Sequence, residues 1–141
     1  MVRIISLLVG ATLLVPVASL ACGGGSVMSA TKSDGTKVGL IISNQQIHAS
    51  PSWNPEMGEP PLPVSEAYRL VKEWSKSQYS RYDAVDVREI ALTEHGCSLA
   101  EDVWYYRVDL LPVFDGNRVW GGGNFAAVLM DGTVIGPTEL D

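Results

Sequence analysis

The clearest hydrophobic pattern in the chain spans residues 63–79. Its apolar positions recur at i, i+3, i+4 and i+7 and therefore share one helix face: Val64, Ala67, Leu70, Val71 and Trp74. Pro63 fits a first turn, where no backbone N–H is needed, and Glu66 suits the positive end of the helix dipole. We predict an amphipathic helix over 63–79 that must bury its apolar face against another layer.

Strand patterns follow this helix. Within 84–94 the apolar phase changes after Val87, and a β-bulge near Arg88-Glu89 would return the later apolar residues to the same face. Residues 102–114 alternate more regularly between the two faces of a strand. Both segments are therefore predicted to be strands of one sheet.

The chain closes with a predicted hairpin over residues 125–137. Its apolar run is interrupted by Asp131-Gly132, and an Asp-Gly pair between apolar runs is a strong hairpin signal. Before it, the glycine-rich segment 115–124 is expected to be a loop. Strands joined by short loops pair antiparallel.

The order of these elements predicts an α+β fold, with one helix packed on a three- to four-stranded antiparallel sheet in two layers. We expect the helix to cover one sheet face, since an apolar sheet face needs a cover. The expected core comprises Leu70, Val71, Trp74, Val87, Ile90, Trp104, Tyr106, Val108, Val128 and Met130.

The region before the helix is less regular. Residues 22–36 are rich in glycine, serine and threonine and are predicted to be a flexible tether. A single domain over 37–141 would follow, beginning with a short strand near 38–43. The next segment, 44–63, contains five prolines and is predicted to be neither helix nor central strand, with its proline-rich lead-in over 50–63 pinned by Trp53.

The first 21 residues have the pattern of a secretory signal peptide. Arg3 is followed by an apolar run over 4–17, and small residues stand at Ser19 and Ala21, just before Cys22. The run is shorter than a membrane-spanning helix requires. We therefore expect an exported protein, located in the periplasm or at the cell surface.

Cys22 has three possible roles. The segment Ser19–Cys22 resembles the lipobox of bacterial lipoproteins, which would make Cys22 a lipid attachment site and membrane anchor. Cys97 is the second of two cysteines, and in an oxidising compartment an even number favours a disulfide between them. The third possibility is that neither modification occurs.

Charge excludes some partners. The formal net charge of −6 and the scattered acidic residues argue against nucleic acid, because phosphate binding needs clustered Lys and Arg. The same charge argues against a basic peripheral membrane surface. Apart from a lipid on Cys22, the expected partner is a protein or peptide of the cell envelope.

No metal site is predicted. The chain has two histidines, His48 and His95. His95 and Cys97 could supply two zinc ligands, with Glu94 or Asp102 as a third, but loop histidines beside cysteines are more often solvated or structural. We expect neither a metal nor another cofactor.

No catalytic residues are predicted either. Ser29 and Lys32 fit the S-x-x-K pattern of acyl-transfer enzymes, but they lie in the expected tether without the partner motifs. The glycine-rich stretch 121–124 precedes a strand, so it lacks the helix N-terminus of a phosphate cradle. We predict that the protein is not an enzyme.

One face of the second strand is a candidate for partner binding. Because side chains alternate along a strand, Tyr105 and Arg107 are expected to point away from the helix, and Trp120 lies in the following loop. Exposed aromatic residues beside an arginine are common binding hot spots. The predicted binding residues are therefore Tyr105, Arg107 and Trp120.

Two alternatives stay open. Residues 50–62 could cover this strand face, with Trp53 packed over it. In a different class of function, a small molecule could bind in a pocket between helix and sheet, lined by Trp74 and Trp104.

The order of motifs resembles a known family. The segments VSEAYRLVKEW, VREIAL, VWYYRVDL and AAVLMDGTVI, within residues 64–136, are similar to the PepSY-type domains of secreted bacterial proteins. The resemblance implies a non-catalytic module linked to protease inhibition or regulation at the cell envelope. A cystatin-like helix-on-sheet fold is its near neighbour.

Overall fold

The computed structural model describes residues 25–96 and 100–141. The expected signal peptide over 1–21 and both cysteines, Cys22 and Cys97, lie outside these residues. The elements run in the order β1 (Met28–Thr31), β2 (Lys37–Leu40), α1 (Asn44–Ala49), the 3-10 turn η1 (Pro55–Met57), α2 (Val64–Gln78), β3 (Ala84–Glu94), β4 (Trp104–Phe114), β5 (Asn117–Arg118), β6 (Phe125–Leu129), β7 (Val134–Ile135) and β8 (Thr138–Glu139).

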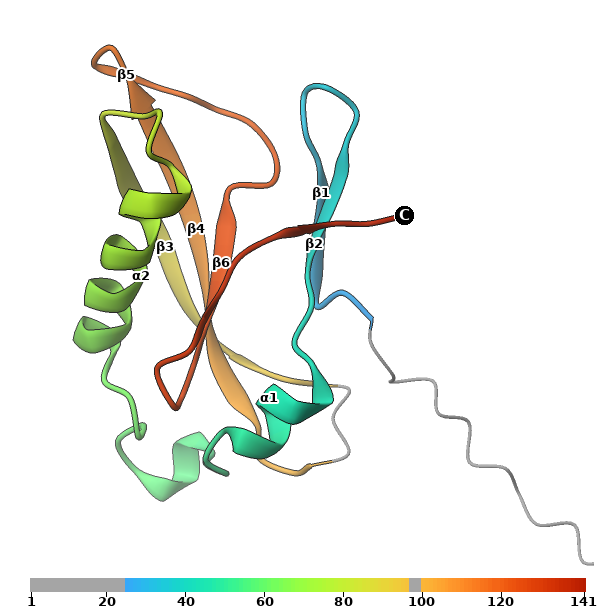
Figure 1. Cartoon of the computed structure of the whole chain (residues 1–141). Coiled ribbons are helices and arrows are strands. Elements are labelled where there is room, and N and C mark those ends of the chain that lie inside the picture. Colours follow the sequence, from blue (N-terminus) through green and yellow to red (C-terminus); the bar gives the residue numbers. More distant parts are fainter. Residues whose placement is uncertain (1–24, 97–99) are drawn as a thin grey trace, which may run out of the picture.

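Two antiparallel sheets dominate the fold. The larger has the strand order β3-β4-β6-β7, with β5 paired to β4, and the smaller has the order β1-β2-β8. Figure 1 shows α2 on one side of the larger sheet and the β1–β2 hairpin on the other. The α+β class is confirmed, whereas the two-layer expectation is incomplete because it lacked the second sheet.

Helix α2 begins and ends within one residue of its predicted bounds. Pro63 is the N-cap, and Glu66 stands in the first turn. Ala67 and Val71 are fully buried on the face toward the larger sheet. The spacing of the apolar positions therefore located this element well, because its buried stripe is long and regular.

The predicted bulge in β3 is present. The β3–β4 register shifts between Val87 and Glu89, so Arg88 is the extra residue on the bulged strand. The bulge lets Val87 oppose Leu110 and Ile90 oppose Val108. Val85, Val87 and Ile90 consequently reach the face that α2 covers, whereas Leu92 is 39% exposed.

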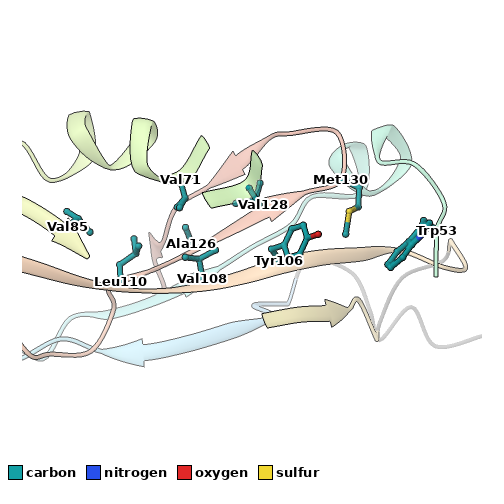
Figure 2. Close-up of a cluster of buried hydrophobic side chains, with 10 residues drawn as sticks. Trp53, Val71, Val85, Tyr106, Val108, Leu110, Ala126, Val128 and Met130 are labelled. Atoms are coloured by element: carbon teal, nitrogen blue, oxygen red, sulfur yellow. The ribbon is translucent and has the colours of Figure 1, made fainter. Parts of the chain in front are cut away.

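The expected core forms between α2 and the larger sheet. All ten predicted residues belong to this cluster, half of them buried and half packed around its edge. Figure 2 shows its side chains on the sheet face beneath the helix, with Trp53 at one end beyond Met130.

The proline-rich segment is held against the domain near Trp53. The backbone N–H of Trp53 donates to the carbonyl of Asp102 at 2.8 Å, and the Tyr106 hydroxyl donates to the carbonyl of Leu62 at 2.7 Å. The Trp53 side chain is buried on the α2 side of the sheet. It therefore pins the segment, as predicted, but does not cover the opposite face.

A second core lies on that opposite face. It joins residues on or directly beside β2, α1, β4 and β6: Val38, Leu40, Ile42, Ile47, Val103, Tyr105, Phe125, Ala127 and Leu129. The larger sheet is thus apolar on both faces along β6, where every residue is buried. The N-terminal hairpin and α1 supply the second cover.

Two N-terminal expectations were wrong. Strand β1 lies inside the expected tether 22–36 and pairs with β2 along its whole length. Helix α1 lies inside the segment expected to be non-helical. Its N-terminus is a capping box, in which Ser43 Oγ accepts from the Gln46 N–H at 3.2 Å and the Ser43 N–H donates to Gln46 Oε1 at 2.9 Å.

Candidate binding cleft

The structure corrects the predicted binding face at Tyr105. This side chain is only 3% exposed, because β2 and α1 pack over its side of β4. Burial also raises the pKa of its hydroxyl. The alternation along β4 was predicted correctly, but the face opposite α2 is covered at this point and does not meet solvent.

The other two predicted binding residues have separate neighbours. Arg107 is half-buried and pairs with the Glu89 carboxylate on the adjacent strand at 3.2 Å. Trp120 is 67% exposed, and the Arg88 guanidinium lies 5.5 Å from the centre of its ring. With Tyr105 buried, the expected three-residue face does not form, and Trp120 is its accessible aromatic member.

Trp120 stands in the wall of a cleft of about 510 Å³. Four segments form this cleft: the β1–β2 turn, the end of α2, the loop 119–124 and residues 136–137. Figure 1 shows the β1–β2 turn and the end of α2 at the same end of the molecule, with the loop between them. We call it the Trp120 cleft; its aromatic lining residues are Trp74, Tyr79, Tyr82 and Trp120.

Glycine backbone makes part of the cleft possible. A Cβ on Gly122 would lie 2.6 Å from the carbonyl oxygen of Thr31, and one on Gly136 would lie 2.5 Å from Trp74 Cζ2. Gly123 adopts a φ of +88°, which favours glycine. The loop therefore packs tightly on β1, and the Trp74 ring rests against the backbone of residue 136.

The aromatic side chains near the end of α2 contact one another in series. The ring centres of Trp74 and Tyr79 are 6.2 Å apart, and those of Tyr79 and Tyr82 are 6.0 Å apart. Such edge-on and tilted contacts are favourable geometries for aromatic pairs. Burial raises the pKa of Tyr79 to about 12, so its hydroxyl stays protonated at neutral pH.

The β-bulge explains how Trp120 is held. A bulge re-aims the side chain of the extra residue, and here that residue is Arg88, which lies over the Trp120 ring. A second hollow of about 430 Å³ has Tyr68 and Arg118 in its wall together with Arg88 and Trp120. Trp120 therefore separates two depressions of the surface.

Cations outnumber carboxylates in the Trp120 cleft. Among the described residues that line it, Lys32 and Arg81 are cationic and Asp34 alone is acidic. Neither Lys32 nor Arg81 forms an ion pair within 25–96 and 100–141. Arg81 instead donates to the Tyr82 hydroxyl at 2.8 Å and lies 4.9 Å from the centre of that ring.

The carboxylate of Asp34 is occupied by its own turn. Its Oδ1 accepts from the backbone N–H of Thr36 at 2.9 Å, and this hydrogen bond is the largest cause of the lowered pKa of Asp34. The positive charge of Lys32 lowers the same pKa as a lesser contribution. Asp34 therefore stays ionised while its oxygen serves the β1–β2 turn.

Trp74 and Trp104, which were expected to line one pocket between helix and sheet, do not line the same cleft. Trp74 does line the cleft, but Trp104 packs edge-on against Trp53 with 6.1 Å between ring centres. Trp104 begins β4 and Trp74 is near the end of α2, so the two rings belong to opposite ends of the helix–sheet layer. In the cleft, the Trp74 ring contacts Tyr79, and Trp120 is the other tryptophan in the lining.

Sequence reasoning missed Lys32, Tyr79, Arg81 and Tyr82 as site residues. The cluster Tyr79–Tyr82 directly after a predicted helix was the available signal, since aromatics at a helix end are often half-exposed. Lys32 carried no such signal, because its position depends on the unforeseen pairing of β1 with β2.

Neither metal nor membrane features stand out in the described residues. Within 25–96 and 100–141, no group of three His, Cys, Asp or Glu side chains could hold a metal ion. No helix in this part of the chain is long and apolar enough to cross a membrane.

A scan against protein-family models and searches of curated proteins and solved structures found no match to this chain.

Proposed function

We propose that this protein is an exported, non-catalytic binding domain whose ligand site is the Trp120 cleft. The observation that carries the proposal is the lining of the cleft: four aromatic side chains, from the end of α2 and from the loop 119–124, line a volume of about 510 Å³. Ligand sites combine such aromatic walls with a few polar groups that fix orientation. Here the polar groups in the lining are Lys32, Ser33, Asp34, Gln78, Arg81 and Asn124.

The titratable groups in the cleft favour binding over chemistry. Its lining contains no histidine or cysteine among the residues that the structure describes. The Tyr79 hydroxyl is held protonated, with a pKa of about 12, and the Asp34 carboxylate is engaged by its turn. General acid–base catalysis needs a group with a pKa near the working pH, and none of these groups meets that requirement.

The sequence of residues 1–21 supports the exported part of the proposal, and Ser19–Cys22 supports a lipid anchor at Cys22. A protein or peptide partner is the second candidate ligand, favoured by the 67% exposure of Trp120. The resemblance to PepSY-type domains would give such a partner a regulatory or inhibitory context.

Fragment screening tests the site directly. A mixture of small aromatic and saccharide fragments is added to the ¹⁵N-labelled protein, and amide and indole shifts are mapped onto the structure. We expect the fragments to bind in the Trp120 cleft, because a preformed site with aromatic walls binds a variety of fragments. Trp120→Ala should remove these shifts, whereas Met57→Ala, at a residue 62% exposed and outside the cleft, should leave them unchanged.

Fragments that bind elsewhere, or that bind equally well to the Trp120→Ala variant, would contradict the proposal. Thermal unfolding of both variants serves as the control for folding. Because Trp120 and Met57 are largely exposed, we expect both unfolding temperatures to stay close to that of the parent protein.

A further inference from the structure

The Trp120 cleft differs in charge from the molecule around it. The whole chain carries a formal net charge of −6, yet the cleft is lined by two cations and one carboxylate. A local reversal of sign in a concave site concentrates ligands of the opposite charge.

The two cations come from separate parts of the fold. Lys32 follows β1 in the N-terminal hairpin, and Arg81 follows α2. The Lys32 stem passes close to Gly123, where an added Cβ would lie 3.2 Å from Lys32 Cγ. Packing of this stem against the glycine loop restricts Lys32 more than an ordinary surface lysine.

The single carboxylate does not neutralise this pair. Asp34 is bonded to the Thr36 N–H, and no ion pair joins it to Lys32 or to Arg81 in the residues described. Arg81 remains able to donate to a ligand, since its recorded hydrogen bond uses one terminal nitrogen, toward Tyr82.

We propose, on the basis of the proposed binding function, that the ligand of the Trp120 cleft carries an anionic group held by Lys32 and Arg81. Its phosphate or carboxylate oxygens accept charge-assisted hydrogen bonds from these two side chains. The rest of the ligand is an aromatic or sugar ring that packs on Trp120 and Tyr82. The Tyr82 ring contacts Arg81 and so lies next to the anion position.

Matched probes test charge and ring separately. The probes are phenyl phosphate with phenol, glucose 6-phosphate with glucose, benzoate with benzyl alcohol, and inorganic phosphate alone. Dissociation constants are measured from the Trp120 indole resonance. We expect the anionic member of a pair to bind about tenfold more tightly than the neutral one, since two charge-assisted hydrogen bonds are added at a partly exposed site.

Charge variants identify the residues responsible. Lys32→Met combined with Arg81→Gln should reduce the preference for the anion to about twofold or less, because both donors are removed. Lys37→Met removes a positive charge from an exposed residue of the same hairpin, outside the cleft, and should keep the preference. Addition of 0.5 M salt should weaken the anionic probes alone, since screening acts on the charged pair.

The failures are distinguishable. Equal binding of the charged and neutral probes in the cleft would overturn the anionic inference and leave the proposed binding function standing. Binding of inorganic phosphate as tight as that of phenyl phosphate would overturn the role of the ring. Absence of any shift at Trp120 with every probe would overturn both the inference and the proposed function.

Discussion

Two pairs of tryptophans occupy opposite ends of the helix–sheet layer and have opposite surroundings. Trp53 and Trp104 pack edge-on beside the start of β4, and Trp53 is 4% exposed. Trp74 and Trp120 line a cleft near the end of α2, and Trp120 is 67% exposed. Figure 1 places the start of β4 and the end of α2 at opposite ends of the molecule.

The difference separates the structural role of Trp53 from the binding role that we propose for Trp120. Trp53 lies between the proline-rich segment and the sheet, so its large apolar area holds that segment on the domain. Trp120 contributes little burial to the fold and leaves its ring available to a ligand. Under the proposed function, the same residue type thus serves stability at one end and recognition at the other.

The largest expected effect is on the structural pair. Trp53→Ala should lower the free energy of unfolding by about 3–5 kcal/mol, because it leaves a cavity among Met130, Tyr106 and Trp104. Urea denaturation measures the loss. The matched change Trp120→Ala should alter stability by about 0.5 kcal/mol or less, since this side chain is exposed. Equal losses in the two variants would remove the distinction between the pairs.

A smaller loss of stability is expected at Gly136, where the backbone of the cleft packs against Trp74. Gly136→Ala places a Cβ 2.5 Å from Trp74 Cζ2, so the indole ring must move. We expect a loss of about 1–3 kcal/mol, as for overpacking elsewhere, and a shifted Trp74 indole resonance. Gly121→Ala, in the same cleft, meets nothing within 4 Å and should change neither quantity.

A weaker effect is expected from the contact of Arg88 with Trp120, which restrains the Trp120 ring. Arg88→Ala removes a cation–π contact at an exposed site, which is worth about 0.5–1 kcal/mol. We expect greater mobility of the Trp120 ring, measured as a lower indole order parameter, with global stability nearly unchanged. Arg88→Lys should restore part of the order; rigidity unaltered in Arg88→Ala would show that the bulge does not position Trp120.

The smallest effect on stability at neutral pH is expected from the two histidines, of which His95 is buried and His48 is exposed. Burial lowers the pKa of His95 below its ordinary value of 6.5. Below pH 6.5 the unfolded chain therefore binds more protons at this site than the native chain, so stability falls as the pH falls. His95→Gln should flatten the stability profile between pH 7 and 5, and the exposed control His48→Gln should retain it. A steeper profile in His95→Gln would reverse the assigned sign.

The sequence was most informative where burial is periodic. Helix α2, the bulge at Arg88 and the Asp131-Gly132 hairpin follow from local patterns that also decide which side chains face the core. These elements depend on contacts between neighbouring strands or on one long apolar stripe. Local spacing is sufficient information for such cases.

The rest depended on contacts distant in sequence. The alternation along β4 predicted that Tyr105 and Trp104 point to opposite faces of the sheet. Only the packing of β2 and α1 decides that Tyr105 is buried. Helix α1 is too short to show a period, although the capping box of Ser43 and Gln46 marked its start. The Trp120 cleft joins four separate segments, so no local pattern could assemble it.

The most direct test uses the four indole N–H resonances of the chain, since each tryptophan is its own reporter. Phenyl phosphate is titrated into the ¹⁵N-labelled domain. We predict that the resonances of Trp74 and Trp120 shift with one common dissociation constant while those of Trp53 and Trp104 stay fixed. Shifts at Trp53 and Trp104, or none at Trp120, would contradict the assignment of the cleft as the binding site.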